Sequence, residues 1–299
     1  MTGGSPALAE LRPLLTEVGD AKRVRVAAVS GSLAEQAFAR AWGRLVAGED
    51  AAAVALSETA AAVARARLAG IDGAVLRTAG LADDQAQAVL RRAFDEVAAP
   101  IAEGLADRLR DALPMLRPAG PPPPLAAALN AQPRAGATSP GRPRVIVEPP
   151  ESHGDHCLTV AVYGCLLAPV VGADPVPPFL LGLAHHLHNV ALPDAGFAGE
   201  VLLGGALDEV IGTLEERELA RLPAALADRL RAVLALRADA VVPASQAFHA
   251  ADVLDRVLQV HHHARAAAFT ATQALDDLEL VHVGPVQAFH LDVLAAAGL

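Results

Sequence analysis

The chain of 299 residues contains very little lysine, cysteine and aromatic residue. Lys22 is the only lysine, so arginine supplies almost all of the positive charge, and the formal net charge is −10. An acidic chain without a basic cluster is poorly suited to bind a nucleic-acid backbone, but it can bind a small anion through a metal ion. We therefore expect a small anionic substrate and no nucleic-acid partner, while a homo-oligomer stays open.

The two cysteines, Cys157 and Cys165, do not suggest a disulfide. On one helix they would lie roughly 12 Å apart, which is too far for a bond between them. We predict two buried thiols in a reducing compartment. The N-terminus shows no secretory pattern, and the longest apolar run, Cys157–Gly172, is short for a membrane span and contains Pro169. These features predict a cytoplasmic protein without a membrane segment.

The composition and the periodicity of the apolar residues predict an all-α fold. The sequence is 53% hydrophobic but only 3% aromatic, and alanine is abundant. Alanine and leucine favour helix, and alternating patterns typical of strands do not persist over any long distance. Arg23–Val29 fits a short strand about as well as a helix, and Ser32 is suited to cap the helix after it. Apolar residues recur at helical spacing over 33–46, 51–68, 82–97 and 101–113.

The segment 117–144 predicts a linker between two domains. It contains a run of prolines, Pro121 to Pro124, followed by further prolines and several glycines. Proline removes a backbone donor and blocks helix interiors, so we expect extended chain here. This leaves a helical N-terminal region, 1–116, without an assigned role, and a C-terminal domain, 145–299. Helices are expected in that domain at 154–169, 176–190, 200–214, 216–237, 244–265, 267–277 and 284–297.

All 11 histidines lie in the second half of the chain, from His153 onward. Histidine is the side chain that most commonly binds transition metals, so this clustering indicates a metal site. A single histidine is more commonly a packed or solvated residue. The hypothesis therefore rests on three segments that each carry several ligand-type residues.

The first segment, ESHGDHCLTVAVYGCLLA, predicts a helix that is nearly all apolar after His156. A histidine at that point lies where the solvent meets the core, which suits a metal ligand. His153 lies three residues earlier on the same face, and with Asp155 it fits a capping cluster equally well. We take His156 as the ligand candidate.

The second segment, FLLGLAHHLHNVALPDAGFAGE, places His185 and His186 after an apolar run, inside a predicted buried helix. Burying two imidazoles without partners costs free energy, and metal ligation offsets that cost. Asp194 and Glu200 follow just after the helix. They are candidate carboxylates for positioning or deprotonating a water molecule.

The third segment, SQAFHAADVLDRVLQVHHHARAA, carries a polar stripe on a helix with apolar flanks. His249, Asp252, Arg256, Gln259 and His263 recur at spacings of three and four residues, so they share one face. The alternative is a solvated face with an Asp252–Arg256 pair worth roughly a few tenths of a kcal/mol. The apolar flanks favour a helix that is not fully exposed.

Taken together, the three segments resemble the HD-domain superfamily. In that family, a histidine on one helix, a His-Asp pair on a following apolar helix and an aspartate on a later helix hold one or two metal ions inside a helical bundle. His156 matches the first position, and Asp252, within AADVLDRVL, matches the last. The pair falls at His185-His186, within LAHHLHN, where the family usually reads like LLHDIGK. The resemblance covers roughly the C-terminal half of the chain and implies an HD-like bundle there.

One departure from the family pattern is His186, which replaces the aspartate of the pair. Imidazole binds one ion through its nitrogen, but it bridges two cations poorly. We therefore expect one divalent transition-metal ion (Fe, Mn, Zn, Co or Ni). The resemblance implies four ligands, which are His156, His185, His186 and Asp252.

The resemblance also implies a metal-dependent phosphohydrolase that acts on a small phosphate ester or nucleotide through a metal-activated water. Asp194, Glu200 or Asp255 would orient or deprotonate that water, and Arg256 and His263 would bind the phosphate. Two alternatives stay open. One is an iron oxygenase of the HD type, and the other is a degenerate domain that senses a ligand or mediates assembly without catalysis.

Overall fold

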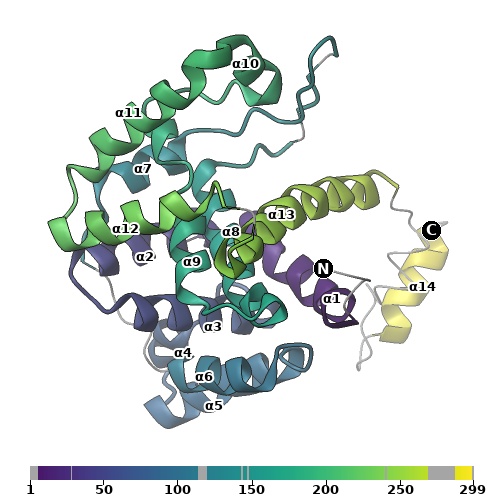
Figure 1. Cartoon of the computed structure of the whole chain (residues 1–299). Helices are drawn as coiled ribbons and strands as arrows, with labels where there is room; N and C mark the ends of the chain where they lie inside the picture. The colour runs from purple at the N-terminus through teal and green to yellow at the C-terminus, as the bar shows by residue number, and fades with distance from the viewer. Residues whose placement is uncertain are drawn as a thin grey trace. The chain divides into compact units, whose positions relative to one another are not determined.

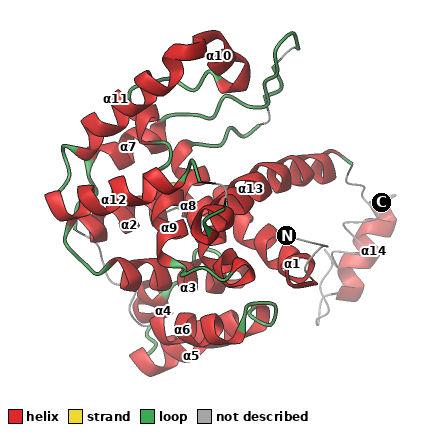
Figure 2. Cartoon of the chain, viewed as in Figure 1, coloured by secondary structure: helices red, strands yellow, loops and turns green. Residues whose placement is uncertain are grey.

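The computed structural model describes residues 6–27, 29–113, 120–142, 144–146, 148–239, 241–268 and 287–297. The contacts group the chain into two units, 1–256 and 257–299, and the boundary lies within one long helix. The fold is all-α, as predicted (Figure 1 and Figure 2). The described residues also contain one small antiparallel sheet of two strands. In chain order the elements are α1 (Pro6–Gly19), η1 (Asp20–Lys22), β1 (Arg25–Val26), β2 (Val29–Ser32), α2 (Leu33–Val46), α3 (Ala51–Leu68), α4 (Gly73–Thr78), α5 (Asp83–Val97), α6 (Glu103–Ala112), α7 (Pro124–Ala131), α8 (His153–Leu167), η3 (Ala168–Val171), α9 (Val176–Ala184), η4 (Leu187–Val190), α10 (Gly196–Leu203), η5 (Gly204–Ala206), α11 (Leu207–Leu219), α12 (Ala224–Leu236), α13 (Pro243–Ala267) and α14 (Gln287–Ala297).

Most of the predicted helices are present with nearly the predicted limits. α2 and α3 begin and end at the predicted residues, and α5, α6, α8 and α13 differ by one or two residues at an end. The limits predicted as 200–214 and 216–237 are wrong, because α10, α11 and α12 occupy that region. Pro223 stands at the N-cap of α12, where a residue without an amide hydrogen suits a helix start. The predicted helix 267–277 lies almost entirely outside the described residues.

The segment predicted as an extended linker contains α7, so that prediction is wrong for Pro124–Ala131. Pro124 occupies the first turn of α7, where its missing amide hydrogen is not needed. Leu125 and Leu129 are buried, because α7 packs against α2, α8 and η4. The described residues on both sides of the segment belong to one compact unit, rather than to two domains joined by a linker.

A pair of helix caps connects the N-terminal region to the start of α8. Ser32 caps α2, as predicted, by accepting a hydrogen bond from the amide of Glu35 at 2.9 Å. The hydroxyl of Ser32 also donates to Asp155, which forms a capping box with Ser152 at the start of α8. All three residues that share this contact, Ser32, Ser152 and Asp155, are buried. The N-terminal region therefore helps to fix the position of α8.

α8 is the central helix of the first unit. Every residue of α8 is buried, and the helix packs along α9 (Figure 1). The two helices approach closely at Gly182, where a Cβ would lie 2.5 Å from the backbone of Ala161. Glycine permits this separation because it has no side chain. The close approach brings His156 of α8 near the residues that follow α9.

Among the described residues, His153–Val171 is the one stretch long and apolar enough to span a membrane, and 83% of its most apolar window is buried. Such burial is typical of a core helix in a soluble protein. Cys157 and Cys165, which lie in this stretch, are both buried and free, as predicted.

Candidate metal centre

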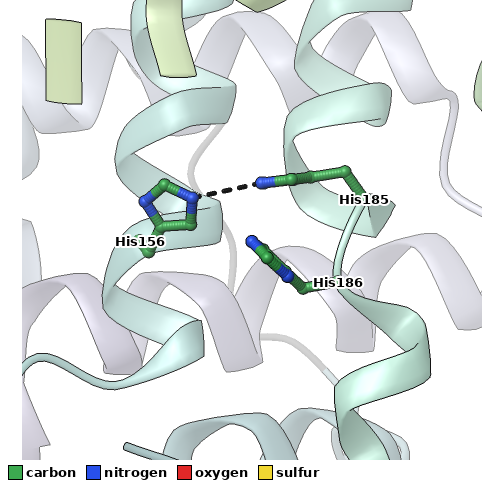
Figure 3. A group of neighbouring side chains, drawn as sticks. All are labelled: His156, His185 and His186. Carbon is green, nitrogen blue, oxygen red and sulfur yellow. Dashed lines mark hydrogen bonds between the residues drawn. The ribbon is translucent and has the colours of Figure 1, made fainter. Parts of the chain in front are cut away.

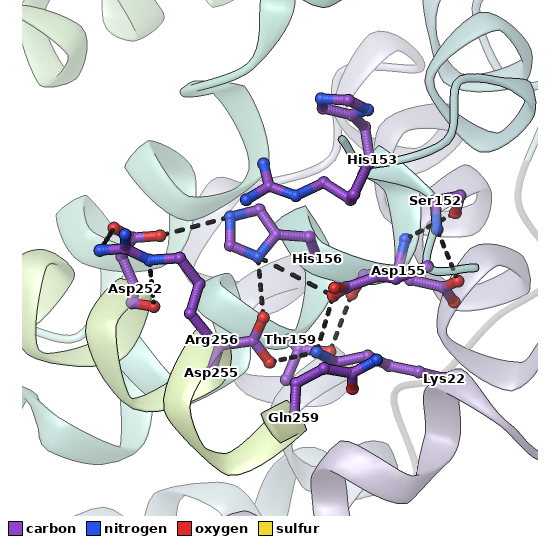
Figure 4. A network of polar contacts seen from close by, with 12 residues as sticks. Lys22, Ser152, His153, Asp155, His156, Thr159, Asp252, Asp255, Arg256 and Gln259 are labelled. Carbon is purple, nitrogen blue, oxygen red and sulfur yellow. Dashed lines mark hydrogen bonds and ion pairs between the residues drawn. The ribbon is translucent and has the colours of Figure 1, made fainter. Parts of the chain in front are cut away.

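His156 is the central residue of the candidate site. It is fully buried near the start of α8. Its Nδ1 donates a hydrogen bond to Oδ2 of Asp255 at 2.7 Å, and Oδ1 of Asp255 lies 2.5 Å from Nζ of Lys22 (Figure 4). With its hydrogen on Nδ1, the neutral ring presents a lone pair at Nε2, which is the form of imidazole that binds a metal ion.

His185 brings a second lone pair to the same point. It caps the C-terminus of α9, and its Nδ1 donates to the carbonyl oxygen of Gly182 at 2.7 Å. Its Nε2 therefore carries a lone pair, and this atom lies 3.2 Å from Nε2 of His156 (Figure 3). Two lone pairs that face each other in a buried site repel unless a metal ion, or a proton on one of the rings, lies between them.

The helix α9 ends at Ala184, so the prediction that both histidines lie inside a helix is wrong. Successive residues of a continuous helix point about 100° apart and do not face each other. The chain instead leaves helical geometry at His186, which has φ −113° and ψ 22°, and continues into η4. This change of direction places the ring centroids of His185 and His186 4.2 Å apart.

His186 supplies the third nitrogen. Its Nδ1 donates to Oδ1 of Asn189 at 2.7 Å, and Asn189 is itself oriented because its amide donates to the carbonyl of Leu192 at 3.0 Å. Nε2 of His186 therefore carries a lone pair, which accepts a hydrogen bond from Nη1 of Arg134 at 2.8 Å. One ring nitrogen from each of His156, His185 and His186 lies within 4.8 Å of the other two.

Asp252 of α13 places a carboxylate beside His156, outside the group of three mutually close ring nitrogens. Its Oδ1 lies 3.3 Å from Nε2 of His156, and its Oδ2 accepts a hydrogen bond from Arg256 at 2.9 Å. Burial opposes the charge, but His156, His185 and Arg256 outweigh burial and hold the pKa of Asp252 well below its usual range. Asp252 is therefore ionised at neutral pH.

The three histidine nitrogens lie close enough together to hold one small cation, and Asp252 lies beside His156 only. Two ligand atoms that each lie about 2.1 Å from a tetrahedral ion are about 3.4 Å apart. The atoms His185 Nε2 and Asp252 Oδ1 lie 3.2 Å and 3.3 Å from Nε2 of His156. Burial, together with neighbouring histidines, lowers the pKa of His185 and His186 well below the usual range, so both rings are neutral. The group thus presents lone pairs and one negative charge, which is the donor set of a metal site.

A second group of ligand-type atoms lies on the opposite side of the His156 ring. It consists of Nδ1 of His156 and carboxylate oxygens of Glu151 and Asp255. The ammonium group of Lys22 lies there, 2.7 Å from Oε1 of Glu151 and 2.5 Å from Oδ1 of Asp255. Because a positive charge already compensates these carboxylates, the Nε2 side of His156 is the candidate cation site.

The residues predicted as catalytic carboxylates lie in three different environments. Asp255 contacts Nδ1 of His156, so it orients the ring from the side away from His185. Both oxygens of Asp194 accept backbone hydrogen bonds, from Ala135 at 2.9 Å and from Gly196 at 2.8 Å. Glu200 is exposed on α10. The structure therefore gives Asp255 a positioning role and does not bring Asp194 or Glu200 into the group of candidate ligands.

The residues predicted to bind phosphate, Arg256 and His263, fall in different units. Arg256 lies beside Asp252, and its side chain is 55% exposed. His263 belongs to the second unit, where its Nε2 lies 3.2 Å from Nε2 of Gln259. Of the two, Arg256 is the one that the structure places at the site.

Three residues at or behind the site lie outside the predicted set. Lys22 belongs to η1, and Arg134 lies in the segment predicted as a linker. The ring of His153, which the sequence associates with capping, lies 4.9 Å from the ring of His186, and its Nδ1 donates to the carbonyl of Gln132 at 3.0 Å. For these residues, the sequence offered one signal: Lys22 is the single lysine in a chain rich in arginine, which marks it as unusual.

The assignment of this site rests on the geometry of the side chains and on their hydrogen bonds. Lys22 and Asp255 support His156, Gly182 supports His185, and Asn189 supports His186. Comparison of the chain with family models, with curated proteins and with solved structures finds no match.

Proposed function

We propose that the chain binds one divalent transition-metal ion through His156, His185, His186 and Asp252 and uses it to hydrolyse a small phosphate ester or nucleotide. The observation that carries this proposal is the set of three ring nitrogens that converge while the other nitrogen of each ring donates a hydrogen bond elsewhere. The order of these residues along the chain also resembles the HD-domain pattern, which implies a phosphohydrolase.

A bound ion supplies a water ligand of lowered pKa and a positive charge for phosphate oxygens. The chain's own residues hold the ligands in place. Lys22 compensates the buried charge of Asp255, and Asp255 in turn fixes the tautomer and the orientation of His156. Asn189 does the same for His186. Such supporting hydrogen bonds increase the basicity of the ligating nitrogen and reduce the reorganisation that metal binding requires.

We infer one ion rather than two. His186 offers a single nitrogen where a bridging carboxylate would offer two charged oxygens. The acidic group behind His156, formed by Glu151 and Asp255, is compensated by Lys22. We also infer a cytoplasmic location, because the free thiols of a soluble protein persist in a reducing compartment.

The donor set supports a second candidate, an iron oxygenase. Neutral imidazoles combined with one carboxylate suit iron(II) as well as they suit zinc or manganese. Oxygen-dependent turnover by the iron-loaded protein, without phosphate release from any ester, would favour the oxygenase. A protein that binds no transition metal would favour a sensor or assembly module without catalysis.

Metal analysis of the untagged protein tests the ligand assignment. We expect close to one equivalent of metal in the wild type and a loss of affinity of at least about tenfold in both His185→Ala and Asp252→Ala. His249→Ala is the matched control, because His249 is an exposed histidine of α13 whose Nε2 contacts the carbonyl of Arg237. Full metal content in both site variants would show that the ligand assignment is wrong.

A screen of phosphate esters and nucleotides tests the reaction. Each substrate is incubated with protein loaded with Mn, Zn, Co, Ni or Fe, and phosphate release is measured. We expect release by the wild type with at least one metal and its loss in Asp252→Ala. Absence of release with every metal and substrate, from protein shown to hold one equivalent of metal, would reject the hydrolase and leave the metal site standing.

A further inference from the structure

Arg134 is held in a fixed position beside the candidate metal ligands. Its backbone amide donates to the carbonyl of Glu151 at 2.8 Å, just before α8. The next amide, that of Ala135, donates to Asp194 at 2.9 Å, and Ala137 pairs with Val145. These contacts place the half-buried side chain of Arg134 so that Nη1 lies 2.8 Å from Nε2 of His186.

The positive charge of Arg134 opposes the binding of a metal ion when no anion is bound beside it. A guanidinium group stays protonated at all physiological pH values, so it repels a metal ion bound to the same nitrogen cluster. In the described part of the chain, Arg134 forms no ion pair with a carboxylate. The carboxylate of Asp194, which interacts with it electrostatically, has both oxygens engaged with backbone amides.

An anion that contacts both positive charges removes this conflict. A guanidinium presents parallel N–H groups that match two oxygens of a phosphate, and a metal ion binds a further oxygen of the same group. From the position of its guanidinium against His186, we propose that Arg134 binds the anionic group of the substrate, a phosphate monoester, between itself and the metal ion. This inference rests on the proposed function and deepens it, because it names the residue that recognises the phosphate.

His153 provides a second, independent observation. Its side chain is fully buried, and its Nδ1 donates to the carbonyl of Gln132. Its Nε2 lies 3.6 Å from Oδ2 of Asp194 and has no hydrogen-bond partner among the described residues. With Nδ1 carrying the hydrogen, Nε2 is an acceptor beside the ring of His186. A buried acceptor of this kind is matched by a donor that a ligand brings. Inorganic phosphate supplies such a donor at neutral pH, because both of its ionic forms carry a hydroxyl; a phosphate monoester supplies one in its monoanionic form, and sulfate supplies none.

The ligand cluster is buried on one side and partly exposed to solvent on the other. His156 and His185 are buried, whereas His186, Arg134 and Asp252 are partly exposed. A small ester would therefore approach the ligand cluster from the side of Arg134, the residue that we assign to substrate binding.

Calorimetric titration of the Mn²⁺-loaded protein with inorganic phosphate tests the proposal. We expect Arg134→Gln to bind phosphate at least tenfold more weakly than the wild type, while its affinity for Mn²⁺ stays the same or increases, since a repelling charge is removed. Arg134→Lys, which keeps the charge without the fork of donors, should fall between the two. Arg142→Gln is the matched control, because it removes an exposed arginine from the same segment and should change neither affinity.

In Arg134→Gln, a role in ligand binding lowers the affinity for phosphate but not the affinity for Mn²⁺, whereas a structural role lowers both. If phosphate and Mn²⁺ affinities fall together, Arg134 supports the fold, and the inference is overturned. Unchanged phosphate binding by metal-loaded Arg134→Gln would also overturn it, but would leave the proposed metal site intact. Failure of the wild type to bind Mn²⁺ or any other transition metal would reject the proposed function itself. Sulfate should bind at least several-fold more weakly than phosphate, and equal affinity would overturn the assignment to a phosphate monoester.

Discussion

Replacing Lys22 by methionine should reduce the free energy of unfolding by about 3–5 kcal/mol, which is the usual effect of breaking a buried ion pair. The Lys22 side chain is 3% exposed and that of Asp255 is 1% exposed. Burial opposes the charge of Lys22, but Asp255 and Glu151 outweigh it and raise the pKa of the amine. Methionine has a similar length and no charge, so it would leave the carboxylate of Asp255 buried without a positive partner.

Urea denaturation at pH 7, followed by far-UV circular dichroism and by the fluorescence of the buried Trp42, measures this effect. The double variant Lys22→Met/Asp255→Asn should recover at least half of the loss, because the neutral amide does not need a cation. Arg77→Met is the control, since the Arg77–Asp83 pair is exposed and contributes under about 1 kcal/mol. A Lys22→Met protein within about 1 kcal/mol of the wild type would refute the assigned role of the lysine.

Three further predictions concern the packing and charges around the site. Gly182→Ala should destabilise the protein by about 1–3 kcal/mol and weaken metal binding, because the new methyl group would meet the backbone of Ala161 at 2.5 Å. Gly212→Ala, on an open face of α11, is the control and should not destabilise the protein. Equal shifts of the melting temperature in the two variants would contradict the argument. Glu58→Gln should cost about 3 kcal/mol in urea denaturation, since the carboxylate is fully buried between two arginines of α2, and a change below about 1 kcal/mol would show that the pairs contribute little. Burial of Asp72 opposes its charge, but hydrogen bonds from the first amides of α4 and an arginine of α3 lower its pKa. Its contribution to stability, about 1 kcal/mol as an N-cap, should be present above its unfolded pKa of about 3.9 and disappear as the pH falls through the lower folded value. Comparison of wild type and Asp72→Ala between pH 6 and pH 2.5 measures this, and a difference that grows on acidification would contradict it.

The sequence predicted those features of the site that depend on local patterns. His156, His185, His186 and Asp252 were proposed from their positions relative to apolar helices, and the structure brings a ring nitrogen of each histidine together, with Asp252 beside His156. The fold class and most helices followed from periodicity, which is a property of short windows. The end of α9 at Ala184 did not, because the pattern of apolar residues continues past it.

The features that the sequence did not predict depend on contacts between distant segments. Arg134 reaches the site because the proline-rich segment folds back against the start of α8, and prolines alone suggested an extended linker. Lys22 reaches Asp255 across more than two hundred residues of sequence, so no local pattern could connect them. Composition therefore could not predict that the N-terminal region supports the site, or that residues 1–256 form one compact unit.

The burial of the only lysine has a practical consequence. A reagent that acylates side-chain amines has a single target in this chain, and that amine is enclosed by Glu151, Asp255 and the core. Its acylation requires a local opening, so the rate at which mass spectrometry detects the modified residue reports how often the interior beneath His156 becomes exposed to solvent. Ligands that tighten the histidine cluster should slow that reaction, which makes the lysine a built-in probe of occupancy.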